Sequence, residues 1–142
     1  MIHQLIYTSS RAGNLGDAEL DALLLAAREN NTRLGLTGVL LCTNDQFMQV
    51  LEGSRDALEQ LFARIVADPR HEDVRVVIRR RVTKRDFANW QMALRDARAK
   101  PLAPGCELVR FFEADFDVQA LPDASPTGFL LRAFRDIELG AA

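Results

Sequence analysis

The chain has 142 residues, of which 48% are hydrophobic and 27% charged, and its formal net charge is −2. This length and composition predict one soluble domain with a substantial core and a short appended segment. The weak net charge gives no overall field that would attract nucleic acid or an anionic membrane, so we expect neither as a direct partner.

The first predicted element is a strand over residues 2–9, where Ile2, Leu5, Ile6 and Thr8 favour β structure. Because the segment is short and apolar, we expect it in the centre of a sheet. Tyr7 then lies near the C-terminal end of the strand. Taken alone, Tyr7 is interpreted as a core aromatic residue whose hydroxyl bonds a neighbour.

A loop over residues 10–16 leads into a predicted amphipathic helix. The apolar residues of this helix recur at i, i+3, i+4 and i+7, and they are Leu20, Leu23, Leu24 and Ala27. Asp17 is the expected N-cap. The pair Asn30–Asn31 is expected to end the helix, and Gly35 to complete the connection.

Two strands joined by a tight turn come next. The expected strands cover residues 36–43 and 47–52, with residues 44–46 as the turn. An amide, Gln49, occupies the middle of the second, apolar strand. A buried amide without a partner costs about 1–3 kcal/mol. Gln49 therefore either faces solvent or meets a polar partner inside the protein.

The second predicted helix begins after Ser54, its expected N-cap. Its apolar stripe consists of Leu58, Leu61, Phe62, Ile65 and Val66. The pair Asp68–Pro69 ends it, because proline cannot continue a helix. Arg70 and His71 follow, either as solvated surface or as contacts for an anion or a polar ligand.

Two further strands are expected, over residues 74–82 and 90–94. The first contains three consecutive arginines, Arg79–Arg81, which we interpret as a solvated sheet edge because acidic residues lie nearby. In the second, Trp90 and Met92 are two residues apart and share a face, with core packing as the simplest role.

This order of elements predicts an α+β fold, a ferredoxin-like sandwich with a five-stranded mixed sheet and two helices on one face. The expected strand order is 4-1-3-2, with the fifth strand beside one edge. A flat ligand could lie between the two helices. We expect residues 1–95 to form this domain, and residues 96–142 a C-terminal helical extension that packs on the sheet or on a partner.

Sequence motifs for several kinds of chemistry are absent. The two cysteines, Cys42 and Cys106, have no metal or redox spacing, and the N-terminus does not look like a signal peptide, so we expect a reduced, cytoplasmic protein. The chain has no phosphate loop, nucleophile motif or paired metal ligands. The sequence therefore predicts neither a metal site nor hydrolytic or redox catalysis by side chains alone.

Five motifs, covering about residues 1–95, occur in an order and at spacings typical of one known family. They are Ile6-Tyr7-Thr8-Ser9, Asn31-x-x-x-x-Leu36-Thr37-Gly38-Val39-Leu40, Phe47-x-Gln49-x-Leu51-Glu52-Gly53, Asp68-Pro69-Arg70-His71 and Phe87-x-x-Trp90-x-Met92. Together they resemble the BLUF domain, a blue-light sensor that uses flavin. The chain looks like a short protein of that family.

The resemblance implies a noncovalently bound flavin between the two helices, usually FAD, with FMN tolerated. It implies that Tyr7 donates an electron to the excited flavin, and that Gln49 relays a change in hydrogen bonding. Asn31 would bond the polar edge of the ring, and Trp90 and Met92 would belong to the strand that reports the change. The other implied flavin contacts are Leu23, Leu24, Ala27, Ile65, Arg70 and His71.

The function implied is that of a photoreceptor without an enzyme activity. We expect no fused output enzyme, because 142 residues leave little room for one. The signal would pass through the fifth strand and the C-terminal helices to an effector protein or to a change in a homo-oligomer. The candidate contact residues are Phe111, Phe112, Phe129 and Phe134. The main alternative is a ferredoxin-like interaction module without a chromophore, and a less favoured one is a small enzyme such as an acylphosphatase, whose arginine and asparagine pattern is absent.

Overall fold

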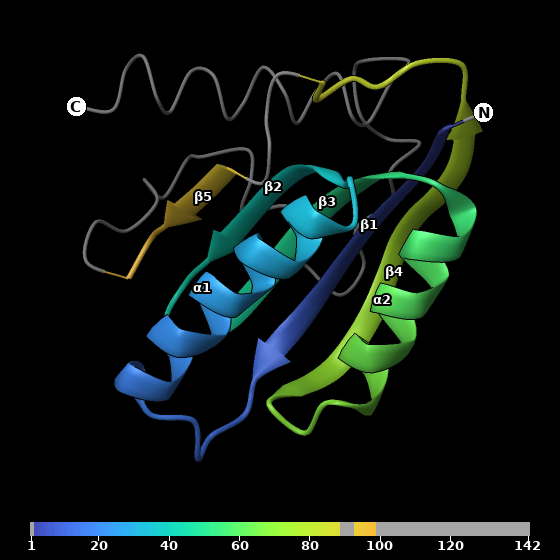
Figure 1. The fold of residues 1–142 in the computed structure, drawn as a ribbon. Helices are drawn as coiled ribbons and strands as arrows, with labels where there is room; N and C mark the ends of the chain where they lie inside the picture. The colour runs from blue at the N-terminus through green and yellow to red at the C-terminus, as the bar shows by residue number, and fades with distance from the viewer. Residues whose placement is uncertain (1, 89–92, 99–142) are drawn as a thin grey trace, which may run out of the picture.

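The computed structural model describes residues 2–88 and 93–98, which form a two-layer α+β fold (Figure 1). The elements in chain order are β1 (Ile2–Arg11), α1 (Asp17–Arg33), β2 (Thr37–Cys42), β3 (Gln46–Gly53), α2 (Arg55–Ala67), β4 (His71–Val82) and β5 (Ala93–Asp96). The strands make one sheet in the order β4-β1-β3-β2-β5. The predicted ferredoxin-like sandwich and its strand order are therefore confirmed.

The sheet is mixed, as predicted, because β5 pairs in parallel with β2 while the other neighbours are antiparallel. β1 lies in the interior of the sheet between β3 and β4. In the register of β1 with β3, Tyr7 stands opposite Gln49. Residues on neighbouring strands that stand opposite each other share a face, so this pairing brings the two side chains together.

Both helices cover the same face of the sheet and run side by side in front of it (Figure 1). The side chain of Ser54 accepts a hydrogen bond from the backbone N–H of Ala57, so it caps α2 as expected. α2 ends at Ala67, directly before the pair Asp68–Pro69. Both boundaries of α2 follow from local chemistry alone.

The ends of α1 differ from the prediction. Gly16 is the N-cap, without a side-chain hydrogen bond, and Asp17 is the first helical residue. The carboxylate of Asp17 pairs instead with Arg11, with 3.0 Å between Oδ1 and Nη2. The helix also continues past Asn30–Asn31 to Arg33. Asn31 is buried, and the helix is terminated instead by Gly35, whose φ of 73° lets the N–H groups of Gly35 and Leu36 bond the carbonyls of Thr32 and Asn31.

Several strand ends also differ from the prediction. β1 runs to Arg11 and β4 begins at His71, because these two residues pair with each other across the strands. β2 and β3 leave residues 43–45 as the turn, one residue earlier than expected. β5 lies at Ala93–Asp96, later than the expected 90–94. Trp90, Met92 and the predicted C-terminal helices, including the four phenylalanines, fall outside the described residues.

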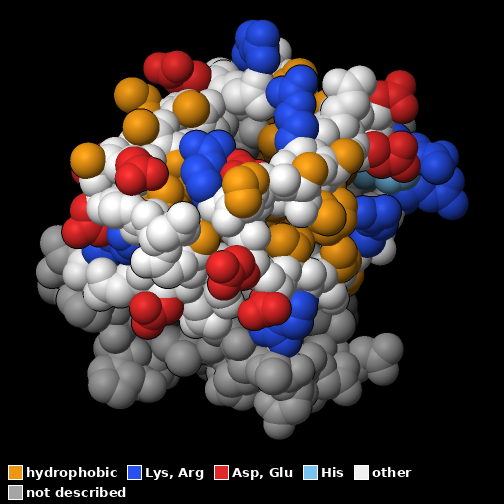
Figure 2. All heavy atoms as spheres, turned by 90° about the horizontal axis from the view of Figure 1, so that it is seen from below, with side chains coloured by type: hydrophobic (Ala, Val, Ile, Leu, Met, Phe, Trp, Pro, Cys, Tyr) orange, Lys and Arg blue, Asp and Glu red, His pale blue; other side chains and the backbone are white. Residues whose placement is uncertain are grey.

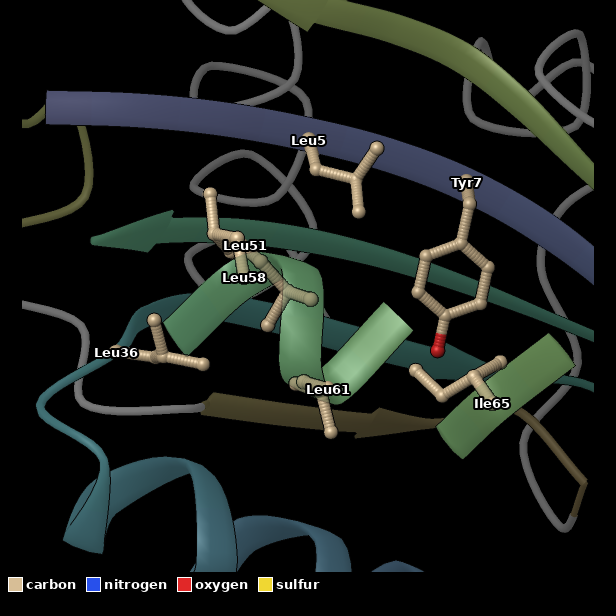
Figure 3. Packing of buried hydrophobic residues seen from close by; sticks show 7 residues of the cluster. All are labelled: Leu5, Tyr7, Leu36, Leu51, Leu58, Leu61 and Ile65. Atoms are coloured by element: carbon tan, nitrogen blue, oxygen red, sulfur yellow. The ribbon is translucent and has the colours of Figure 1, made fainter. Parts of the chain in front are cut away.

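The core between the helices and the sheet has two parts. The first lies under α2 and contains Leu5, Tyr7, Leu36, Leu51, Leu58, Leu61 and Ile65 (Figure 3). The second lies under α1 and contains Leu15, Leu20, Leu24, Leu40, Cys42 and Phe47. Two separate clusters below two helices leave room for a cavity along the line between them.

The opposite face of the sheet carries a buried carboxylate, Glu52, that the sequence did not single out as a polar centre. Its Oε2 accepts from Gln4 Nε2 at 2.6 Å and from the backbone N–H of Asp86 at 2.7 Å. Its Oε1 accepts from Thr37 Oγ1 at 3.1 Å and from the backbone N–H of Phe87 at 2.8 Å. Glu52 therefore ties the segment that follows β4 to the central strands.

Candidate functional site

A cavity of about 350 Å³ lies between α1 and α2 and is floored by β1, β2 and β3. Sites for small organic molecules usually have roughly 300–1,000 Å³. Seen from the end of the molecule where β1 stops and α1 begins, hydrophobic side chains gather in the middle of the surface among charged ones (Figure 2). The size and place of the cavity suit one flat organic ligand.

The two long walls of the cavity are apolar. α1 contributes Leu23, Leu24 and Ala27, and α2 contributes Leu61 and Ile65. The helical repeat puts the α1 residues on one face, since positions i, i+3 and i+4 are neighbours there. Two facing apolar walls can hold an aromatic ring system between them by dispersion and by exclusion of water.

The floor of the cavity holds a buried hydrogen bond between two strands. Tyr7 is 1% exposed and Gln49 3% exposed, and Tyr7 Oη donates to Gln49 Oε1 at 2.6 Å. The hydroxyl of Tyr7 points away from β1 toward the part of α2 that carries Ile65 (Figure 3). Tyr7 is thus the polar partner that a buried Gln49 requires, which settles the choice that the sequence left open.

Burial extends to higher pH the range over which Tyr7 stays protonated. Removal of the hydroxyl from water raises the pKa of Tyr7 well above its usual value. The group therefore stays protonated at neutral pH and remains a hydrogen-bond donor. The ring of Tyr7 meets the ring of Phe62 edge to face, with centroids 5.9 Å apart, so the side chain is held in place on two sides.

Three buried side-chain atoms have no hydrogen-bond partner among the described residues: Thr8 Oγ1, Asn31 Oδ1 and Gln49 Nε2. Asn31 and Gln49 both line the cavity. Each unpaired buried group costs about 1–3 kcal/mol, so this cost would be recovered if a ligand supplied the partners. Such a ligand would present an acceptor to the amide N–H of Gln49 and a donor to the carbonyl of Asn31.

A flavin ring satisfies these requirements. It is flat and tricyclic, and one end carries carbonyl oxygens, ring nitrogens and an N–H group close together. The apolar walls suit the body of the ring, and the unpaired atoms of Asn31 and Gln49 suit its polar edge. The buried polar groups of the cavity lining are two neutral amides and a tyrosine. The described part of the chain contains no group of three or more His, Cys, Asp or Glu residues that could hold a metal ion.

Charged and polar side chains stand at the mouth of the cavity, where Arg70 and His71 both contribute to its lining. Arg70 is exposed, and its guanidinium forms two-atom contacts with Asp68, at 2.7 and 3.0 Å. This pairing lowers the pKa of Asp68 and raises the pKa of Arg70. The contact holds Arg70 near the rim, and an ion pair so exposed adds little to stability.

His71 is half-buried rather than a solvated surface residue. Its Nδ1 lies 2.8 Å from Ser9 Oγ, and its ring packs on Phe47 with centroids 4.8 Å apart. Burial lowers the pKa of His71, and the nearby charge of Arg70 acts in the same direction, against an opposing effect of Asp68. The ring is therefore held in one place beside the cavity and favours its neutral form.

All predicted contact residues that the structure describes line this one cavity: Tyr7, Leu23, Leu24, Ala27, Asn31, Gln49, Ile65, Arg70 and His71. Their role as flavin ligands stays a prediction. Trp90 and Met92 fall in the part of the chain that is not described.

The lining also includes residues that the sequence did not identify as contacts, namely Ala26, Asn30, Leu40, Phe47, Leu61, Arg64 and Asp68. Strand alternation could have found Phe47, which is two residues from Gln49, and helix periodicity could have found Leu61, one turn before Ile65. Leu40 stands opposite Gln49, and this contact could be predicted only from the register of β2 with β3. No sequence signal marks Arg64.

Comparison with known families gives one match over most of the described chain. The family model described as "BLUF: Sensors of blue-light using FAD" matches residues 2–93. This range contains every residue that lines the cavity. The family found in this way is the one that the five sequence motifs resemble.

Curated relatives are much longer than this chain. The photoactivated adenylate cyclase subunit beta of Euglena longa is 36% identical over 89 residues, which are 62% of this chain and 10% of that protein. The subunit beta-like protein FB of Euglena gracilis is 33% identical over 99 residues, or 70% of this chain and 11% of that protein. This chain therefore spans about a tenth of the length of either relative.

Solved structures also match, among them two of similar length to this chain. The dark-state structure of BlrB, a BLUF protein, superposes with a TM-score of 0.67 at 28% identity and covers 94% of both chains. The photo-activated state of BlsA gives a TM-score of 0.70 at 26% identity and covers 93% of both chains. BlrP1 of Klebsiella pneumoniae gives 0.66 at 36% identity, over 94% of this chain and 32% of that one.

Proposed function

The chain belongs to the BLUF family of blue-light sensors, whose members bind flavin, and we propose that the flavin in this chain is FAD, with FMN as the alternative, held without a covalent bond between α1 and α2. The single observation that carries the proposal is the buried Tyr7–Gln49 hydrogen bond beside the unpaired amide N–H of Gln49. An unpaired donor at the floor of an apolar slot calls for a ligand with an acceptor at that point.

The remaining contacts of the proposed site follow from the lining of the cavity. Leu23, Leu24, Ala27 and Ile65 would pack against the faces of the ring. Asn31 would accept from the ring N–H, because its Oδ1 is buried and without a partner. Arg70 and His71, at the mouth, would lie beside the sugar-alcohol chain or the pyrimidine end of the flavin.

Bound flavin supplies absorption of blue light and an acceptor for an electron. Tyr7 is the proposed source of that electron, and its hydroxyl proton already lies in a 2.6 Å bond to Gln49 Oε1. An amide has a donor on one side and an acceptor on the other. Rotation or tautomerisation of Gln49 would exchange the group that it presents to Tyr7 with the group that it presents to the cavity.

The route out of the site is proposed to pass through β2 to β5. Leu40 stands opposite Gln49 on one side and opposite Leu94 on the other, so the three residues form a row across the strands. Leu94 packs on the core cluster that contains Leu40 and Phe47. The edge strand β5 thus lies two strands away from Gln49, and residues 99–142 follow β5 in the chain.

The BLUF region is a sensory module, and we propose that this chain has no enzyme activity of its own and acts on an effector protein or through self-association. Photoactivated adenylate cyclases are among its relatives, which makes a light-regulated signalling enzyme a reasonable kind of effector. We also propose a cytoplasmic location. Among the described helices, none is long and apolar enough to cross a membrane.

The test of this function is an absorption spectrum of the purified protein, recorded in the dark and again under blue light. We expect flavin bands that move slightly to longer wavelength in the light and return in the dark. Release of the pigment by heat and separation against FAD and FMN standards would identify the flavin. A colourless protein that takes up neither added FAD nor added FMN would overturn the proposal.

A further inference from the structure

A second cavity, of about 410 Å³, lies toward the N-terminal end of β1. It is bounded by residues 3–5 of β1, the first turns of α2 and residues 79–81 of β4. No lining residue is shared between the two cavities. Leu5 and Leu58 line it but are only 2% and 5% exposed, so its accessible apolar surface comes mainly from the methylene stems of the arginines. The second cavity is therefore separate from the proposed flavin site.

The lining of the second cavity is strongly basic. It contains four arginines and a histidine against a single carboxylate, that of Glu59. Glu59 is already paired with Arg55, with 2.9 Å between Oε1 and Nε. Arg80 turns to the other face, where its Nε donates to Gln4 Oε1 at 2.7 Å and its Nη2 lies 3.6 Å from Asp86.

Arg79 and Arg81 remain on the cavity side. They are two residues apart in β4 and stand opposite Leu5 and His3 of β1, so they share the face that α2 covers. Both are exposed, and no carboxylate in the described part of the chain forms an ion pair with either. The guanidinium of Arg79 lies over the ring of Phe62, 5.5 Å from its centroid.

Gathering several positive charges on one face costs free energy through repulsion, and a bound anion removes that cost. The planar guanidinium group forms paired hydrogen bonds to phosphate and is the usual side chain for recognising it. The α2 helix also begins here, at Arg55, and its positive dipole end adds to the attraction. Among the charged side chains that line the cavity, only that of Glu59 disfavours a bound anion.

We propose that the second cavity binds a small organic phosphate, with the phosphate between Arg79, Arg81 and Arg55 and the carbon part against the apolar methylene stems of these arginine side chains. This apolar surface distinguishes the site from a site for inorganic phosphate, because it stabilises only a ligand that carries apolar surface of its own. The volume lies within the range of small-molecule sites, roughly 300–1,000 Å³, and exceeds what a lone phosphate ion fills.

The experiment is a titration of the full chain in the dark with phenyl phosphate and, separately, with inorganic phosphate, followed by amide chemical shifts. We expect saturable shifts at residues 3–5, 55–59 and 79–81. Phenyl phosphate should bind about tenfold more tightly than inorganic phosphate, because its ring buries apolar surface. Affinity for both should fall as sodium chloride is added.

Variants locate the site. Arg79→Gln together with Arg81→Gln should weaken phenyl phosphate at least about tenfold, since a hydrogen bond to a charged group contributes roughly 1.5–3 kcal/mol. Arg81→Gln alone leaves the contact of Arg79 with Phe62 intact and should weaken binding about tenfold. Lys84→Gln removes the same charge outside the cavity and should change affinity less than about twofold.

Two results would overturn the proposal. One is the absence of saturable binding by the wild-type chain. The other is a loss in Lys84→Gln as large as the loss in Arg81→Gln, which would mean that the ligand responds only to overall charge. The amide spectrum of each variant without ligand shows whether it is folded, so a loss of binding is not confused with a loss of structure.

Discussion

At the scale of single residues, Tyr7 holds the position on which the proposed photochemistry depends. Its hydroxyl donates to Gln49 Oε1 at 2.6 Å, while its ring is packed in the core. Tyr7→Phe removes the hydroxyl and keeps the ring. We therefore expect the variant to bind flavin but to lose the light-induced shift, which dark and illuminated absorption spectra measure. A shift of normal size would refute the role of Tyr7, and Phe62→Leu, which alters only the neighbouring ring, should retain it.

Gly38 is a second position where one residue decides the structure. Its φ is 142°, and a Cβ built there would lie 1.8 Å from the carbonyl oxygen of Val50. Only glycine allows β2 to come this close to β3. We expect Gly38→Ala to lower the free energy of unfolding by about 2–3 kcal/mol, measured by urea denaturation. Gly13→Ala is the control, because a Cβ at Gly13 meets nothing within 4 Å, and it should leave stability nearly unchanged.

At the scale of elements, Glu52 connects β3 to the segment that leaves β4. Its carboxylate accepts from the backbone N–H groups of Asp86 and Phe87, at 2.7 and 2.8 Å. Glu52→Gln replaces one acceptor oxygen by a donor, which must then face another donor. Because hydrogen bonds to charged groups contribute about 1.5–3 kcal/mol, we expect the two amide protons to exchange at least about tenfold faster.

Hydrogen exchange followed by NMR measures this effect directly. Glu59→Gln is the matched control, since Glu59 makes only an exposed i,i+4 pair with Arg55. That pair is exposed to solvent and adds little to stability, so the exchange of Asp86 and Phe87 should not change. Unchanged exchange in Glu52→Gln would show that the segment after β4 is held by other contacts.

The boundaries of elements show where sequence patterns are sufficient. α2 begins after Ser54 and ends before Asp68–Pro69, as predicted, because capping and proline act within a few residues. β1 and β4 extend further than predicted because Arg11 pairs with His71, residues 60 positions apart in the chain. A cross-strand pairing of that kind leaves no local pattern, since Ser10 and Arg11 carry no strand preference of their own.

At the scale of the whole molecule, stability should depend on pH through His71. Burial lowers the pKa of His71 in the folded state, while the unfolded chain takes up the proton at about pH 6.5. The unfolded state then binds more protons between those two pKa values, so the free energy of unfolding should fall as pH drops below about 6.5. Below the folded pKa this contribution levels off.

Thermal unfolding at about pH 7.5 and about pH 5.5 tests this dependence in the range where His titrates. The decrease in Tm between these two pH values should be smaller in His71→Gln than in the wild-type protein. His3→Gln, at the other end of β1, should keep the contribution of His71. An identical decrease in the wild-type and His71→Gln proteins would mean that the buried position of His71 does not affect stability.

The sequence by itself determined the class of fold, the strand order and the family, because hydrophobic periodicity, capping residues and five short motifs are local and readable. It also singled out Tyr7, Asn31 and Gln49 by residue type and position, through resemblance to that family.

The tertiary structure alone decided that Tyr7 Oη bonds Gln49 and that Asn31 Oδ1 and Gln49 Nε2 lack partners at one cavity. It also revealed Arg64 and Asp68 in the lining of the first cavity, the buried carboxylate of Glu52 and the basic second cavity. These features join residues far apart in the chain, and their geometry depends on strand register and helix packing, which no local pattern contains.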